Sequence, residues 1–216
     1  MNIEIIMAEF GGNRSNAGDS ALPTERSEPT LSSFLKHFPE AKAIVYTDQD
    51  WKSTERCEVY KVEQPLFDKL HPRYGWRCND YYQVWGLLRS KADIAIALDS
   101  DLLIVDERVR SIIPLTRRFG LCMPVNGRHL VWRDARSDCD GGKVADESQG
   151  MGMCHCTAFW SFLTQSECHR ELLTRYCLQI RADAKNNNGA RGPLSLWRAI
   201  WDSGISPYTL PVQWCV

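Results

Sequence analysis

Two acids separated by one residue are the clearest candidates for chemistry in this chain. Asp99 and Asp101, with Ser100 between them, follow an apolar segment at 92–98 whose only charge is Asp93. On an extended segment residues i and i+2 point the same way, so the two carboxylates would lie side by side. Like charges this close repel each other unless a cation lies between them. Mg²⁺ and Mn²⁺ prefer oxygen ligands, commonly one or two carboxylates together with substrate phosphates. Asp99 and Asp101 are therefore candidate metal ligands.

A turn is the alternative interpretation of the same triplet, because Asp and Ser side chains often bind backbone N–H groups at strand ends. The flanking residues favour a site, since ADIAIAL precedes the triplet and LLIVD follows it. An apolar strand that ends in two acids places negative charge at the carboxyl end of a sheet, where open α/β sheets bind ligands. A metal held there would neutralise charge on a diphosphate leaving group.

The elements that would position this triplet are apolar strands alternating with amphipathic helices. Strands are expected at 3–10, 41–46, 58–62, 92–98, 121–125 and 153–162, and a short extended tail at 208–212. Helices are expected at 31–38, 79–89, 166–183 and 194–201, with a partly helical stretch at 105–119 interrupted by Pro114 and a loop over 11–30. This alternation predicts an α/β sheet flanked by helices.

The composition limits the partners and the location that we expect. A formal net charge of -1 gives no basic excess to attract nucleic acid. No run approaches the ~20 apolar residues of a transmembrane segment. The opening MNIEIIMAEF is too short an apolar run for a signal peptide, so we expect a cytoplasmic protein. The chain has nine cysteines, an odd number, and in that compartment we expect reduced thiols.

The segment SKADIAIALDSDLLIVD resembles the D-x-D segment of glycosyltransferases with the GT-A fold. The opening is also similar: a strand running into a small loop (MAEFGG), then a helix, a strand and a terminal acid in TLSSFLKHFPEAKAIVYTD. The similarity in order covers roughly residues 1–125. It implies a single GT-A-like domain over 1–216 with a mixed, mostly parallel sheet. Residues 1–125 would bind the nucleotide-sugar and 126–216 the acceptor.

The resemblance also implies an activity. It is the transfer of a sugar from a nucleoside diphosphate sugar, such as a UDP- or GDP-sugar, to a hydroxyl group of a glycan, a protein or a small molecule. Mn²⁺ or Mg²⁺ would be the cofactor. In such enzymes the nucleotide packs on the loop after the first strand, which corresponds to Ala8, Glu9 and Phe10. The acid after the second strand, Asp48, would meet the base or ribose, although it is equally interpretable as a turn residue.

Two further positions follow from the resemblance. Arg77, with Asp80 on the next helical turn, matches a basic residue that contacts the donor phosphate or sugar or braces the first acid, and the alternative is a surface arginine at a helix start. His155 would contact acceptor, donor sugar or metal, and the alternative is a histidine packed in the core. The alternation Cys154-His155-Cys156 lacks the paired spacing of structural zinc sites.

A catalytic base is not fixed by the sequence. The long charged segment Gly127–Gly150 is the best candidate for a surface loop or lid. Its acidic residues are candidates for the catalytic base, and the sequence does not favour one over another: Asp134, Asp138, Asp140, Asp146 and Glu147. Several retaining members of this family have a histidine near the C-terminus that completes the metal site. This chain has no histidine after His169. Retention and inversion therefore both stay open.

Two other functions compete with the transferase. A sugar nucleotidyltransferase would carry a glycine-rich basic loop after the first strand, and GGNRSNAG is faintly similar to one. A non-catalytic nucleotide-binding or protein-interaction module is the other alternative, favoured if the eight tryptophans of the chain are exposed.

Overall fold

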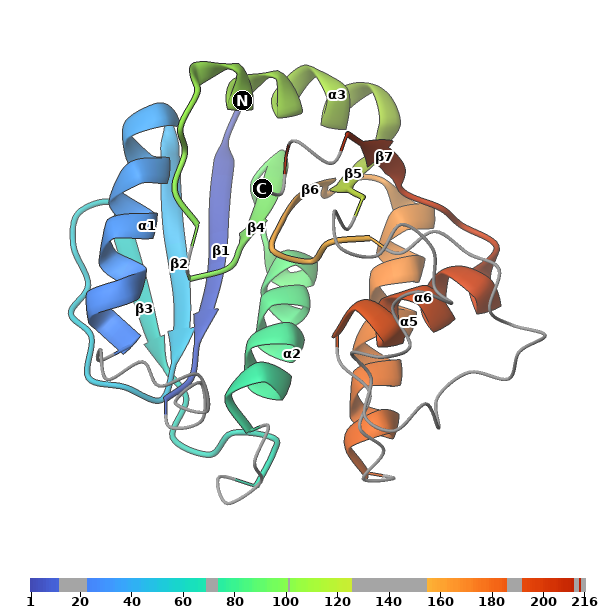
Figure 1. Ribbon diagram of the computed structural model, residues 1–216, viewed down its shortest axis with the longest axis horizontal. Helices are drawn as coiled ribbons and strands as arrows, with labels where there is room; N and C mark the ends of the chain where they lie inside the picture. The colour runs from blue at the N-terminus through green and yellow to red at the C-terminus, as the bar shows by residue number, and fades with distance from the viewer. Residues whose placement is uncertain are drawn as a thin grey trace.

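The fold is an α/β sandwich built around one sheet (Figure 1). The structure, a computed structural model, describes residues 1–11, 23–68, 74–100, 102–125, 155–185, 192–211 and 214. Its strands are β1 (Ile3–Glu9), β2 (Ala41–Thr47), β3 (Cys57–Lys61), β4 (Ile94–Leu98), β5 (Leu121–Pro124), β6 (Phe159–Leu163) and β7 (Tyr208–Leu210). Its helices are α1 (Pro23–His37), α2 (Tyr74–Arg89), the 3-10 helix η2 (Glu107–Ser111), α3 (Ile112–Phe119), α5 (Glu167–Lys185) and α6 (Gly192–Ser203).

The strands form one seven-stranded sheet in the order β3-β2-β1-β4-β6-β5-β7. Strands β3, β2, β1 and β4 pair in parallel, β6 is antiparallel to both β4 and β5, and β7 is parallel to β5. The prediction of an α/β fold with a mixed, mostly parallel sheet flanked by helices is confirmed. Neighbouring strands change from parallel to antiparallel beside β4, the strand that precedes Asp99.

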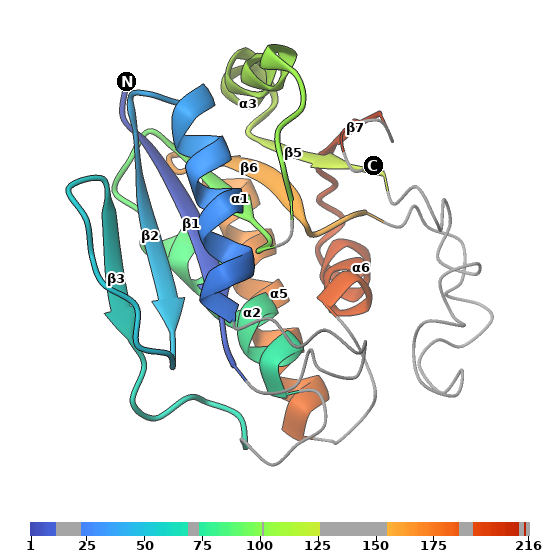
Figure 2. The same cartoon turned by 60° about the vertical axis from the view of Figure 1, so that its left-hand side comes forward.

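Helices cover both faces of the sheet (Figure 2). One hydrophobic core joins the sheet to α2, α5 and α6, with Tyr82, Tyr176 and Leu196 buried in it. The other joins the opposite face to α1 and α3, and includes Phe34 and Ile112. Because both of its faces are covered, β4 is buried at all five positions, which explains its continuous apolar sequence.

Helix α1 begins earlier than the sequence suggested. Residues 11–30 were expected to form a loop, but the helix starts at Pro23 and includes Pro29, so the prediction is wrong from Pro23 onward. Proline suits a first helical position because its missing N–H would have no partner there. Buried hydrogen bonds also hold this part of the helix: Ser27 Oγ donates to Glu9 Oε2 at 3.0 Å, and Thr30 Oγ1 donates to the carbonyl of Ser100 at 2.9 Å.

Other boundaries also differ from expectation. Helix α2 begins at Tyr74 and not at 79. Pro114 falls in the first turn of α3, so the interruption expected there lies between η2 and α3. Strand β6 begins at Phe159, and of the expected strand at 153–162 the described residues before it contribute only an isolated bridge between His155 and Val125. Among the described helices, none is long and apolar enough to cross a membrane.

Candidate functional site

The carboxyl ends of β1, β2 and β4 meet at one edge of the sheet, because these strands are parallel and in register. Asp99 is the first residue after β4. Its backbone N–H donates to the carbonyl of Ala158 at 2.7 Å, and its Oδ1 accepts from the N–H of Ser100 at 2.9 Å. Ser100 is buried and bonded to Thr30 of α1 through its carbonyl. The half-buried carboxylate of Asp99 is thus held on a fixed backbone at the edge.

The loop after β1 is held by two side chains from neighbouring elements. The N–H of Phe10 donates to Oδ1 of Asn79 on α2 at 2.9 Å, and the N–H of Gly11 donates to Oδ1 of Asp48 after β2, also at 2.9 Å. The same Asp48 oxygen accepts from Gln49 Nε2 at 2.7 Å. Asp48 therefore shapes the loop on which a nucleotide was expected to pack.

Helix α2 approaches this loop closely. A Cβ added to Gly75 would lie 3.0 Å from the carbonyl oxygen of Phe10, so glycine allows the contact. The ring of Phe10 stacks on Tyr82 with centroids 4.8 Å apart. Both contacts fix the position of Phe10 relative to α2.

Ala8 and Glu9 lie within β1, and their side chains point to opposite faces, as alternation along a strand requires. Ala8 packs in the core with α2, whereas buried Glu9 bonds Ser27 of α1. The sequence had placed both with Phe10 on a nucleotide-binding loop. In the structure, Phe10 and Gly11 form the start of that loop.

Asp80 of α2 lies against the first residue of helix α6. Its Oδ2 accepts from the N–H of Gly192, the first residue of α6, at 2.9 Å, and an added Cβ on Gly192 would overlap its carboxylate. A carboxylate at a helix N-terminus is favoured by the unpaired N–H groups and the helix dipole. Burial and, to a smaller extent, the charge of Asp80 raise the pKa of the nearby Tyr176 well above its usual value. Asp80 thus joins α2 to α6 beside the edge.

Arg77 points in another direction. Residues 77 and 79 are about 200° apart around a helix, so Arg77 faces away from the Asn79 contact with Phe10. It is buried, with 7% of its surface exposed, and lines a cavity of about 370 Å³ together with Phe67, Asp68 and Arg181. The structure therefore places Arg77 on the side of α2 that faces the end of α5, and its predicted contact with the donor stays a prediction.

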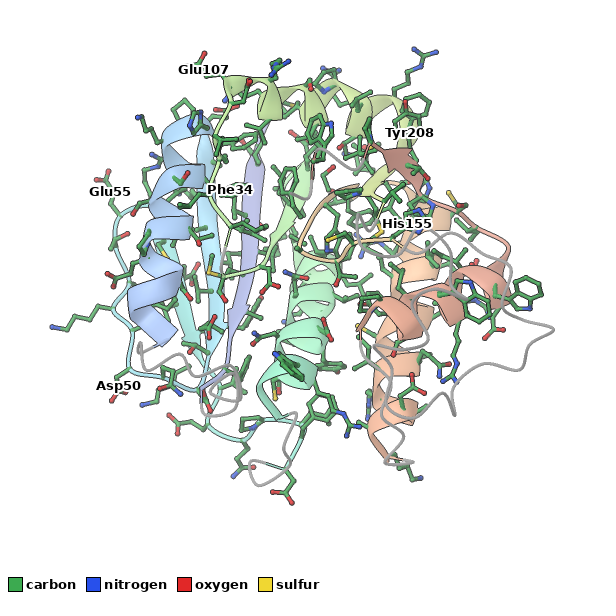
Figure 3. All side chains as sticks on the ribbon, in the orientation of Figure 1. Phe34, Asp50, Glu55, Glu107, His155 and Tyr208 are labelled. Atoms are coloured by element: carbon green, nitrogen blue, oxygen red, sulfur yellow. The ribbon has the colours of Figure 1, made fainter. Side chains whose placement is uncertain are left out.

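His155 lies beside β5 and β7, where its side chain is labelled in Figure 3. It is 3% exposed, and its Nε2 lies 3.3 Å from Thr209 Oγ1. Its Nδ1 has no hydrogen-bond partner among the described residues. Burial lowers the pKa of His155 to about 4, so the imidazole is neutral at pH 7. Since it pairs with Val125 at the end of β5, a strand that runs parallel to β4, it lies near the same edge as Asp99.

The cysteine after His155 departs from expectation. Cys156 is disulfide-bonded, so the prediction of reduced thiols is wrong at this residue. The other cysteines that the structure describes are not in disulfides: Cys57, Cys78, Cys122, Cys168 and Cys177. Burial raises the pKa of Cys177 to about 12 and of Cys122 to about 11, as expected for small residues packed in a core.

Several predicted site residues lie outside the described ranges. They are Asp101, most of the expected strand before His155, the lid segment 127–150 and its acids Asp134, Asp138, Asp140, Asp146 and Glu147. Asp99, Asp48, Phe10 and His155 remain, and the structure brings them to one edge of the sheet.

The sequence reasoning missed two amides on α2. Asn79 and Gln83 lie one turn apart and are both buried. Gln83 Oε1 accepts from Trp160 Nε1 at 3.4 Å, while Asn79 holds Phe10. Their spacing of four residues within the expected helix 79–89 was visible, but the sequence does not show that Phe10 and Trp160 lie against them.

Comparison with known proteins gives a fold and no close relative. No protein-family profile and no curated protein sequence matches the chain. The galactosyltransferase LgtC in complex with donor and acceptor sugar analogues matches at a TM-score of 0.56 and 11% identity, over 93% of this chain and 70% of LgtC. An active-site mutant of LgtC matches at a TM-score of 0.56 and 10% identity, over 98% of this chain and 72% of LgtC.

A nucleotidyltransferase is a weaker match. The 2-C-methyl-D-erythritol 4-phosphate cytidylyltransferase of Thermus thermophilus reaches a TM-score of 0.48 at 10% identity, over 96% of this chain and 87% of its own, and this score is too low to support an inference. The likeness to LgtC establishes the fold alone. The chain has a GT-A-like fold, and its resemblance to GT-A glycosyltransferases is confirmed at that level.

Proposed function

We propose that this chain is a metal-dependent glycosyltransferase that moves a sugar from a nucleoside diphosphate sugar to a hydroxyl acceptor. The observation that carries the proposal is the position of Asp99. It follows a fully buried strand, at the point where the neighbours of that strand change from parallel β1 to antiparallel β6, in a GT-A-like sheet. Ligands of open α/β sheets bind outside the carboxyl ends of the strands, where the topology switches.

Asp99 and Asp101 would hold Mn²⁺ or Mg²⁺. Carboxylates suit these ions, and Asp99 presents one on a backbone fixed by Ala158. Among the described residues, no three side chains of His, Cys, Asp or Glu converge on one point. The remaining ligands would therefore come from Asp101, diphosphate oxygens and water, as is common for Mg²⁺ bound with a phosphate substrate. A metal bound there neutralises charge on the departing diphosphate.

The other residues of the edge would bind the donor and orient it. In the proposal Phe10 and Gly11 form the surface for the nucleotide, and Asp48 keeps that surface in place through the N–H of Gly11. Asp80 would hold the start of α6 beside α2 through the N–H of Gly192. Neutral His155, with Nδ1 unpartnered among the described residues, would accept or donate a hydrogen bond to a sugar hydroxyl.

The test is a thermal-shift series with Mn²⁺ and UDP, GDP or their sugars. A ligand at about 100 times its Kd stabilises the folded state by about 2.7 kcal/mol. For a domain of this size that stabilisation corresponds to a rise in Tm of roughly 5–10 °C. We expect one nucleotide with Mn²⁺ to produce it, and the matching nucleotide-sugar to release the free nucleoside diphosphate, UDP or GDP.

Asp99→Asn is the diagnostic variant. It keeps an oxygen for the N–H of Ser100 but removes the charge that a metal needs, so the ligand-free Tm should stay near that of the wild type while the Mn²⁺–nucleotide shift disappears. Asp106→Asn is the matched control, since it neutralises an acid paired with Arg108 after β4. A wild-type Tm that no nucleotide changes would contradict the proposal. Binding without turnover would favour the non-catalytic module, and release of pyrophosphate from a nucleoside triphosphate and a sugar phosphate would favour the nucleotidyltransferase.

A further inference from the structure

Only one of the two polar atoms of the Asn79 side-chain amide has a hydrogen-bond partner among the described residues. Its Oδ1 accepts the N–H of Phe10 at 2.9 Å, but its Nδ2 is buried and has no hydrogen-bond partner in the described structure. The residue is 7% exposed. Leaving a buried amide donor unpaired is unfavourable, so such a group is expected to have a partner in the working state of the protein.

The orientation of this amide is fixed by its partner. If the oxygen and nitrogen of Asn79 were exchanged, Nδ2 would face the backbone N–H of Phe10, and both groups are donors. Oδ1 must therefore face this N–H. The free donor is therefore Nδ2.

The neighbours of Asn79 on α2 show which way it faces. Gly75, one turn before it, touches the carbonyl of Phe10, and Tyr82 after it stacks on the Phe10 ring. Asp80, the next residue, reaches the start of α6. Asn79 lies between these two directions, at the carboxyl edge and beside the start of the loop after β1.

We propose that Asn79 is a specificity-determining residue for the donor: its Nδ2 donates a hydrogen bond to an oxygen of the nucleoside part of the bound nucleotide, while its Oδ1 holds the loop. This inference rests on the proposed function. Because one amide performs both tasks, the loop that carries the nucleotide and the group that recognises it cannot move independently. Nothing in the sequence pattern marks Asn79 for this task.

Two variants separate the two tasks. Asn79→Asp keeps an oxygen for Phe10 and loses the donor, so the ligand-free Tm should be retained while UDP (or the nucleotide that binds the wild type), titrated calorimetrically with Mn²⁺, binds about 10- to 100-fold more weakly. Asn79→Ala loses both, so binding should weaken without any added charge and the ligand-free Tm should fall. In turnover assays Asn79→Asp should raise KM for the donor while kcat stays within about twofold, because the contact is remote from the reacting bond.

Mn²⁺–pyrophosphate, which has no nucleoside, should bind wild type and Asn79→Ala equally. An equal loss for pyrophosphate would overturn the assignment to the nucleoside. If Asn79→Asp weakens binding and Asn79→Ala does not, charge repulsion is the cause and the inference fails. If both variants bind the nucleotide like the wild type, the inference fails and the proposed function stands. A wild type that binds no nucleotide removes both.

Discussion

The residues at the carboxyl edge differ in how many of their polar side-chain atoms form hydrogen bonds. The oxygen Oδ1 of Asp48 accepts from both Gly11 and Gln49, whereas Nδ1 of His155 and Nδ2 of Asn79 are buried without partners among the described residues. In most of a folded protein such groups are satisfied, and each exception needs an explanation. Under the proposed function, a nucleotide-sugar bound at this edge would supply partners for both atoms.

The burial of His155 predicts a pH dependence of stability. Its pKa is lowered from about 6.5 to about 4 in the folded chain, so below pH 6.5 the unfolded chain binds a proton that the folded chain does not. The free energy of unfolding contributed by this residue is fully present above pH 6.5. It is lost as the pH falls toward 4, by about 3 kcal/mol in total. Urea unfolding at pH 7.0 and 4.5 should show this fall.

His155→Gln should weaken that pH dependence. It will not abolish it, since burial also lowers the pKa of His169. Thr209→Val is the control, because it removes the hydroxyl beside Nε2 and keeps the imidazole, and it should keep the slope. An unchanged slope in His155→Gln would mean that the imidazole is hydrated in solution.

The sequence predicted where a residue lies along a strand or helix better than it predicted which way its side chain points. Asp99 was predictable because five buried apolar residues precede it and end at the sheet edge. Arg77 was placed near the donor by resemblance, but its direction depends on the start of α2. An error of five residues in that start hides which side chains share a turn. Asn79 was missed because it contacts Phe10, 69 residues away in sequence, and no local pattern predicts that contact.

Among the elements, helix α6 is tied to its neighbours by two carboxylates. Asp80 of α2 accepts from the N–H of Gly192 at its start. Buried Asp183 of α5 accepts from Ser195 Oγ and Arg198 Nη1, each at 2.7 Å. The last strand of the sheet, β7, follows α6, so these contacts also help to place β7 beside β5.

Gly192→Ala tests the first contact. The added Cβ would overlap the Asp80 carboxylate, so we expect a loss of about 1–3 kcal/mol in the free energy of unfolding. Asp80→Ala removes the cap and also the obstacle. In a double-mutant cycle Gly192→Ala should therefore cost much less in the Asp80→Ala background, giving a coupling of about 1 kcal/mol or more. Strict additivity of the two changes would show that the two groups do not touch.

Asp183→Asn tests the second contact. It leaves the partly buried Arg198 beside a neutral amide, and we expect a loss of about 3 kcal/mol, measured by urea unfolding. Arg175→Ala is the control, because its pair with Glu171 is exposed on the surface of α5 and should contribute under about 0.5 kcal/mol. Equal effects of the two substitutions would contradict a structural role for Asp183.

Element types were predictable from hydrophobic periodicity, whereas some element ends were not. Strand β4 and helix α5 have strong patterns and were found close to their observed bounds. The first turns of α1 read as a loop because proline, serine and threonine suggest turns locally. Tertiary hydrogen bonds from Ser27 to Glu9 and from Thr30 to Ser100 outweigh that local preference.

In the whole molecule the two predicted halves are interleaved. Strand β6 from the second half lies between β4 and β5 of the first, and β5 in turn separates β6 from β7. Sequence order alone could not show this arrangement, because no pattern in β6 and β7 predicts which strands they pair with. The division into a nucleotide-sugar half and an acceptor half stays a prediction, and strands from both halves belong to one sheet.

This interleaving predicts that the full chain unfolds in one cooperative transition and that a fragment of residues 1–125 does not fold. In the fragment β5 loses both of its partners and β4 loses β6, so backbone N–H and C=O groups along the edges of both strands lose their hydrogen bonds. The core shared by β1, α2 and α5 also loses Leu172, Leu173 and Tyr176. Urea unfolding followed by circular dichroism and by tryptophan fluorescence should give coincident curves for the full chain. The fragment should show no sigmoidal transition, and one that unfolded cooperatively would mean that the first half is a domain in its own right.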